Sequence, residues 1–88
     1  MKITNDLKNE LLQNPKTIES VTVLYKKKKK YEGELAFVSE VPFEVKIFDK
    51  DNQDEDEMEH FIDFEKAMEI SVAHFDGTIS VFKDVELD

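Results

Sequence analysis

The spacing of the apolar residues changes once along this chain, at Asn14-Pro15, and this change limits the fold more than any other feature. Before it, Ile3, Leu7 and Leu11 recur every four residues, which places them on one stripe of a helix. After it, apolar and polar residues alternate in runs rich in β-branched and aromatic side chains, which is typical of strands. The pattern predicts one short helix followed by an antiparallel sheet.

The predicted helix covers residues 4–13. Thr4 or Asn5 can accept a hydrogen bond from a free N–H group of the first turn, and Asp6 lies near the positive end of the helix dipole. Asn14 ends the helix because the residue before a proline is pushed out of the α region. A helix this short is unstable alone in water, so its apolar stripe is expected to be buried against the sheet.

The alternating runs predict five strands, separated by turn residues and by one acidic segment. The strands cover residues 18–26, 30–38, 42–48, 68–75 and 78–83, and the acidic loop covers residues 49–59. The fold class is therefore α+β, mainly β, in a single domain over residues 1–88. We expect a small antiparallel barrel or a strongly bent sheet that ends in a C-terminal β-hairpin.

The C-terminal hairpin is predicted from Asp76-Gly77. This dipeptide is a strong signal for a two-residue type I′ turn, which needs positive φ at both positions. Such a turn places Val72 opposite Val81 and His74 opposite Ile79.

The segment 55–68 is compatible with two structures. At strand spacing, Ile62 and Phe64 form a short strand that a tight turn at 65–67 joins to the next strand. At helical spacing, the apolar residues of the segment share one face: Met58, Phe61, Ile62 and Met68. The alternative fold is therefore a second helix at 55–68, packed on an antiparallel sheet.

The order of the segments supports the strand interpretation through a resemblance. After the helix come a strand that ends in an aromatic residue (21–25), a basic hairpin, a glycine-bearing strand (33–37) and a third strand (43–47), and residues 62–70 resemble a closing strand-turn-strand. This order is similar to that of the small Sm-like barrels of the YolD-like type in Gram-positive bacteria. The resemblance implies a small barrel that begins with a short helix, and it implies a fold more than an activity.

Charge is concentrated in two runs of opposite sign. Residues 26–30 are five consecutive lysines, whereas residues 49–59 contain seven acids and one lysine, in a chain of net charge −9. All 12 basic residues are Lys, so the arginine fork that reads guanine or phosphate is missing. A chain this acidic repels nucleic acid and anionic membranes, and its expected partner is another protein with a basic surface.

The expected partner-binding residues are the carboxylates of the acidic run. They are predicted to lie on an exposed loop, which either contacts a partner or is only solvated: Asp49, Asp51, Asp54, Glu55, Asp56, Glu57 and Glu59. The run starts like an EF-hand, but Asp54 replaces the required glycine and His60 replaces the bidentate Glu, so no calcium site is expected.

The lysine run has three interpretations that the sequence leaves open. Lysines at a strand edge discourage further strand pairing, they can pair with the acidic run of the same or a second copy, and they can contact phosphates. Tyr25 and Tyr31 flank the run and are expected to pack against each other or beneath lysine stems.

Several kinds of chemistry are excluded or disfavoured by composition. The chain has no Cys and only two Gly, which excludes disulfides, thiol chemistry and a phosphate-cradling loop. Nothing brings His60 and His74 together, so no metal or cofactor is expected. No nucleophile motif is present, and a domain of this size rarely has room for both a core and a ligand pocket, so no enzyme activity is expected.

These observations predict a non-enzymatic, small acidic protein-protein interaction module of a bacterium or its phage, which binds through a strand edge or the acidic run and self-associates weakly. The alternative is an acidic mimic of DNA that inhibits a DNA-binding or defence enzyme with the carboxylates of residues 49–59. No apolar run is long enough to span a membrane, and no signal peptide follows Met1, so the expected location is the cytoplasm.

Overall fold

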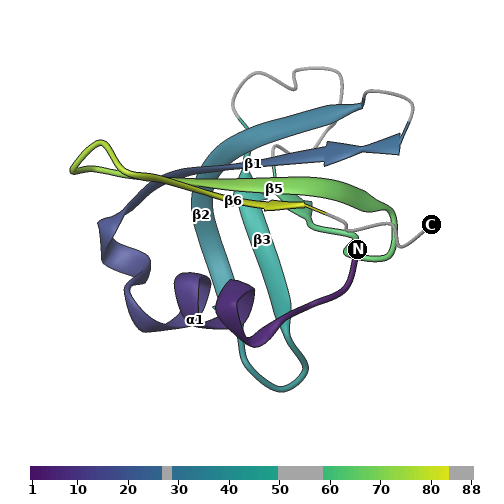
Figure 1. The fold of residues 1–88 in the computed structure, drawn as a ribbon, viewed down its shortest axis with the longest axis horizontal. Helices are drawn as coiled ribbons and strands as arrows, with labels where there is room; N and C mark the ends of the chain where they lie inside the picture. The colour runs from purple at the N-terminus through teal and green to yellow at the C-terminus, as the bar shows by residue number, and fades with distance from the viewer. Residues whose placement is uncertain (27–28, 50–58, 84–88) are drawn as a thin grey trace.

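The computed structural model describes residues 1–26, 29–49 and 59–83, which form one helix, one short 3₁₀ helix and six strands (Figure 1). In chain order the elements are α1 (Asn5–Gln13), η1 (Pro15–Thr17), β1 (Ile18–Tyr25), β2 (Lys30–Ser39), β3 (Glu44–Phe48), β4 (Glu59–Phe61), β5 (Ala67–His74) and β6 (Ile79–Lys83). The fold is α+β and mainly β, as the sequence predicts. None of the described helices has the length and apolar character needed to cross a membrane.

The helix begins at Asn5, one residue later than predicted, and ends at Gln13 as predicted, with Thr4 as its N-cap. The Thr4 hydroxyl accepts a hydrogen bond from Leu7 N at 3.2 Å, and Asn14 ends the helix before the proline. Leu7 and Leu11 are completely buried and belong to the main core, so the docking of the apolar stripe is confirmed.

The six strands form one antiparallel sheet in the order β4-β3-β2-β1-β5-β6. Strand β2 belongs to both halves of it: residues 30–33 pair with β1, and residues 34–39 pair with β3. Figure 1 shows β2 curving between these two partners. The sheet is strongly bent but is not closed into a barrel over the described residues, so β4 and β6 are its two edges.

Gly33 lies at the bend of β2, where it pairs with Val21 of β1. A Cβ atom at this position would lie 2.0 Å from Phe48 O and 2.9 Å from Asp49 N, far inside van der Waals contact. The end of β3 therefore crosses β2 at a distance that only glycine permits.

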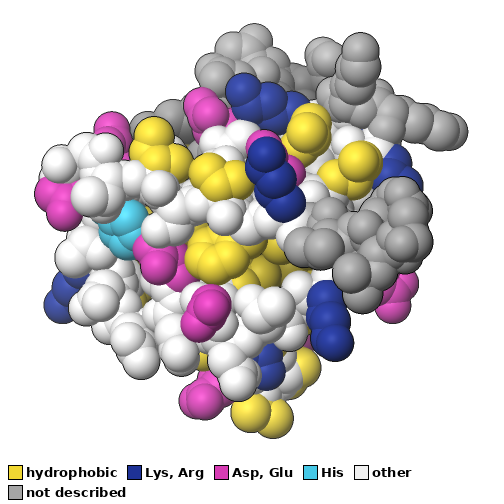
Figure 2. All heavy atoms as spheres, in the orientation of Figure 1, with side chains coloured by type: hydrophobic (Ala, Val, Ile, Leu, Met, Phe, Trp, Pro, Cys, Tyr) yellow, Lys and Arg dark blue, Asp and Glu magenta, His cyan; other side chains and the backbone are white. Residues whose placement is uncertain are grey.

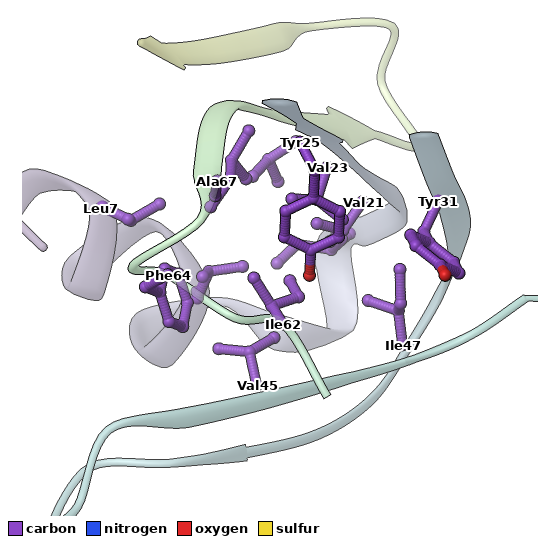
Figure 3. Packing of buried hydrophobic residues seen from close by; sticks show 14 residues of the cluster. Leu7, Val21, Val23, Tyr25, Tyr31, Val45, Ile47, Ile62, Phe64 and Ala67 are labelled. Carbon is purple, nitrogen blue, oxygen red and sulfur yellow. The ribbon is translucent and has the colours of Figure 1, made fainter. Parts of the chain in front are cut away.

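The core fills the inside of the bend, with α1 contributing to it from the open side (Figure 3). In Figure 3, Leu7 and Tyr31 lie at opposite ends of the cluster, with Tyr25 between them. The buried apolar residues come from the helix, from the four strands β1, β2, β3 and β5, and from the connection before β5: Leu7, Leu11, Ile18, Val21, Val23, Tyr25, Tyr31, Val45, Ile47, Ile62, Phe64, Ala67, Ile70 and Val72.

The ambiguous segment forms a strand, a turn and a strand wherever the structure describes it. Its first strand is β4 at Glu59–Phe61, three residues earlier than predicted, and residues 64–66 form the turn before β5. Ile62 and Phe64 are core residues that lie outside a strand. The N–H of Ile62 donates a hydrogen bond of 2.9 Å to Val45 O, just past the end of the ladder between β3 and β4. The alternative prediction of a second helix is therefore wrong for residues 59–68. Residues 55–58 lie outside the described part of the chain.

The C-terminal hairpin exists, but its predicted register is wrong by one residue. Ala73 faces Ile79 and Val72 faces Ser80, so the loop has three residues, not two. Gly77 has φ of 93° and donates its N–H to His74 O at 3.0 Å. This is the geometry of a three-residue hairpin loop with glycine in the left-handed region, which the same Asp-Gly sequence also suits.

A polar network ties α1 to the far half of the sheet. Glu10 accepts hydrogen bonds from the His74 ring and from the Ser80 hydroxyl, the latter at 3.1 Å. The other ring nitrogen of His74 lies 3.0 Å from the Thr17 hydroxyl. Helix, 3₁₀ turn, β5 and β6 are thus joined by side chains as well as by the core.

The bend gives the first testable prediction. Gly33→Ala should destabilise the fold by at least about 3 kcal/mol, the upper end of overpacking costs, because the new methyl group meets backbone atoms that cannot rotate away. Gly77→Ala is the matched control: it has nothing within 4 Å and suffers only the strain of positive φ, about 1 kcal/mol. Urea unfolding of both variants measures the difference, and equal losses would show that β3 does not cross β2 this closely.

Candidate functional site

The acidic run is only partly an exposed surface. Asp49 is 6% exposed and accepts a hydrogen bond from Glu32 N at 3.4 Å, so the expectation that its carboxylate lies on an exposed loop is wrong. The reason is the crossing at Gly33, which presses the residue after β3 against β2. Glu59 is exposed in β4 and forms a salt bridge of 3.0 Å with Lys46.

The remaining residues of the predicted partner-binding set lie outside the described part of the chain: Asp51, Asp54, Glu55, Asp56 and Glu57. Their role as a partner surface stays a prediction. Among the described residues, no group of three or more His, Asp or Glu side chains could hold a metal ion.

The first candidate site is the open edge of the sheet at β6. The ladder between β5 and β6 starts with a hydrogen bond of 2.8 Å from His74 N to the carbonyl of residue 78. Because hydrogen-bonded and non-hydrogen-bonded pairs alternate along an antiparallel ladder, every second residue of β6 bonds to β5. The main-chain groups of Ile79, Val81 and Lys83 therefore point away from β5.

Apolar side chains flank this edge. Ile79 is 65% exposed and Val81 is 50% exposed, both on the outer face of the sheet. Beside them lies a shallow hollow of about 490 Å³. Among the described residues its lining combines small or hydroxyl-bearing side chains with charged and apolar ones: Ser20, Thr22, Leu24, Lys30, Glu32, Glu69, Ser71, Ala73 and Ile79. Figure 2 shows hydrophobic side chains open to solvent near the middle of the molecule's face, with acidic and lysine side chains around them.

The second candidate site is an aromatic cluster where β1, β2 and β4 meet. The rings of Tyr31 and His60 are stacked, with centroids 3.9 Å apart and an interplanar angle of 5°. Tyr25 meets Tyr31 edge to face at 5.7 Å, and Lys29 Nζ lies 5.4 Å from the centre of the Tyr31 ring. The predicted packing of the two tyrosines against each other is confirmed.

The Tyr25 hydroxyl organises the polar side of this cluster. It accepts a hydrogen bond from Asp63 N at 2.9 Å and lies 2.6 Å from His60 Nε2. Since its oxygen receives the Asp63 N–H, its own proton can be donated to the imidazole. Burial raises the pKa of Tyr25 above the usual value and the charge of Asp63 acts in the same direction, whereas the hydrogen bond from Asp63 N lowers it.

Three lysines surround the cluster and line a cavity of about 530 Å³ with it. Lys26 and Lys29 come from the β1-β2 connection, and Lys66 comes from the turn before β5. Lys66 Nζ is 4.0 Å from the Asp63 carboxylate. Lys30 instead lines the hollow on the outer face, so the lysine run serves two surfaces.

Sequence reasoning missed three members of this cavity: His60, Asp63 and Lys66. All three lie within the ambiguous segment 55–68, and the bend in β2 brings them to the hairpin. The alternation in β4 turns His60 inward and Phe61 outward, but a strand of three residues is too short for this alternation to be recognised in the sequence.

No family model, curated protein or solved structure matches the chain. The resemblance to the YolD-like and Sm-like barrels therefore stays a prediction from the sequence.

The raised pKa of Tyr25 predicts how stability depends on alkaline pH. Because the folded state favours the neutral phenol, the contribution of Tyr25 to the free energy of unfolding should be constant up to about pH 10 and then fall as the pH rises toward the pKa of the folded state. A spectrophotometric titration of tyrosinate should contain one component above the ordinary midpoint, and Tyr25→Phe should remove both that component and the alkaline fall. A wild-type curve with no component above the midpoint of free tyrosine would contradict the buried, hydrogen-bonded hydroxyl.

Proposed function

We propose that the chain is a small, non-enzymatic, cytoplasmic interaction module of a bacterium or its phage, and that it binds another protein by adding an extended segment of that partner to β6. The observation that carries the proposal is the open edge of β6. No other described strand pairs with its outward main-chain groups or lies beside its exposed apolar side chains on that edge.

The main chain supplies the first half of the recognition. An incoming strand can exchange hydrogen bonds with Ile79, Val81 and Lys83, whose N–H and C=O groups point away from β5. Such pairing gives affinity without demanding a particular sequence, which is the basis of strand addition in peptide-binding domains.

The side chains supply the second half. Ile79 and Val81 project on the same face as the shallow hollow, so an added strand would extend this face by one row. Every second side chain of the partner would lie next to them. The expected partner segment is therefore extended, with apolar residues at alternate positions.

The DNA-mimic alternative has less support in the described residues. Asp49 is buried and Glu59 is paired with Lys46, so neither presents a free carboxylate to a basic groove. The kinship with small Sm-like barrels is likewise a proposal, supported by the helix that precedes a strongly bent antiparallel sheet.

Selection of binding peptides tests the strand-addition proposal. Random peptides of about ten residues are long enough to span β6. We expect the selected peptides to carry alternating apolar residues and to protect the amides of Ile79 and Val81 from hydrogen exchange. Val81→Pro removes an N–H that points outward and leaves the ladder to β5 intact, so it should weaken peptide binding at least about tenfold with little loss of stability.

Two controls make this experiment decisive. Val81→Thr keeps the N–H and the branched shape, and it should bind peptides nearly as well as the parent. The combined replacement of Asp54, Glu55, Asp56 and Glu57 by Ser should also leave peptide binding unchanged, since the acidic run is not part of the edge. Equal affinity of Val81→Pro and the parent would refute strand addition at β6, and protection that depends on protein concentration alone would assign the edge to a second copy.

A further inference from the structure

The cavity beside Tyr25, Tyr31 and His60 has the charge of a site for anions. Of the seven described residues that line it, three are lysines and one, Asp63, is acidic. The formal charge of these described residues is therefore positive, although the whole chain carries −9. Lysines from two separate connections converge on the cavity. Lysines that served only to keep the protein soluble would not need to gather at one place.

The inner wall of the cavity is rigid and largely apolar. Tyr25 and Tyr31 are both buried core residues, and the stacked imidazole of His60 joins the edge strand β4 to them. The Tyr25 hydroxyl is held between His60 and the main chain of Asp63. A wall fixed by stacking and by hydrogen bonds needs no reorganisation when a ligand enters, which reduces the entropic cost of binding.

The size and the lining together define the class of ligand. A volume of about 530 Å³ is within the range of small-molecule sites and exceeds what a single phosphate ion needs. Lysine ammonium groups bind phosphate as point charges, while aromatic rings and lysine stems contact flat apolar groups. The cavity thus offers a charged rim for a phosphate and an aromatic wall for a ring.

We propose that this cavity binds an organic phosphate monoester of about the size of a mononucleotide. Lys26, Lys29 and Lys66 hold the phosphate, and the ring lies against the wall formed by Tyr31 and His60. This site is separate from the β6 edge and does not depend on the strand-addition proposal. Longer nucleic acid is disfavoured, because the rest of the chain is strongly acidic.

Calorimetric titration with adenosine 5′-monophosphate tests the proposal, with adenosine, ribose 5-phosphate and inorganic phosphate as separate probes. We expect the nucleotide to bind at least about tenfold more tightly than each fragment, since the site contacts both the phosphate and the ring of the nucleotide. In ¹⁵N-resolved spectra, the amides of Tyr31, His60 and Lys66 should shift on addition of the nucleotide. Raising the salt concentration should weaken binding, because the lysines at the rim are exposed to solvent.

Charge-neutral variants separate the site from general electrostatics. The double variant Lys26→Gln and Lys66→Gln should reduce nucleotide affinity about tenfold or more, at an unchanged melting temperature, because both side chains are exposed. The control double variant Lys16→Gln and Lys83→Gln changes the net charge equally at residues outside the lining, and it should bind like the parent.

Three results would overturn the proposal: no heat and no shifts with the nucleotide, equal affinity for the nucleotide and inorganic phosphate, or equal losses in the two double variants. The peptide experiment at β6 is unaffected by any of them. Val81→Pro should bind the nucleotide like the parent, so failure at one site is distinguishable from failure at the other.

Discussion

The close crossing of β3 over β2 at Gly33 is the constraint on which the rest of this structure depends. With Phe48 O only 2.0 Å from the place of a Cβ atom, the two strands meet main chain to main chain. This contact lets β2 pair with β1 over its first four residues and with β3 over its remainder. A flat sheet would leave one face without cover, whereas the bend folds one half over the other around a single core.

The same bend creates the aromatic cavity. Among the described strands, β4 pairs with β3 alone, and β3 reaches the neighbourhood of the β1-β2 hairpin because β2 turns. His60 then stacks on Tyr31, although the two residues are far apart in sequence. The burial of Asp49 has the same origin, so the contact at one glycine determines both the aromatic cavity and the removal of one predicted partner-binding carboxylate from the surface.

Whether a feature could be predicted from the sequence depends on how far apart along the chain the interacting residues lie. Local signals were sufficient for α1, because the Thr4 cap and the proline after Asn14 act within a few residues. The Asp-Gly hairpin was also predicted, but its register was not, since Gly77 suits both two-residue and three-residue loops. The position of β4 and the role of His60 depend on a non-local ladder with β3, which the alternation of a three-residue strand does not encode.

The two edges of the sheet differ in a way that favours β6 as the binding edge. Strand β4 is three residues long, carries a charged Glu59 paired to Lys46, and has its exposed Phe61 ring 5.0 Å from the Lys46 ammonium. Short length and charge are the usual means by which an edge strand is protected from pairing. Strand β6 is five residues long, and its only charged residue, Lys83, lies at its end and 3.8 Å from Glu69. Its exposed side chains before Lys83 are Ile79 and Val81, which carry no charge, so within the described residues this edge lacks the protection that β4 has.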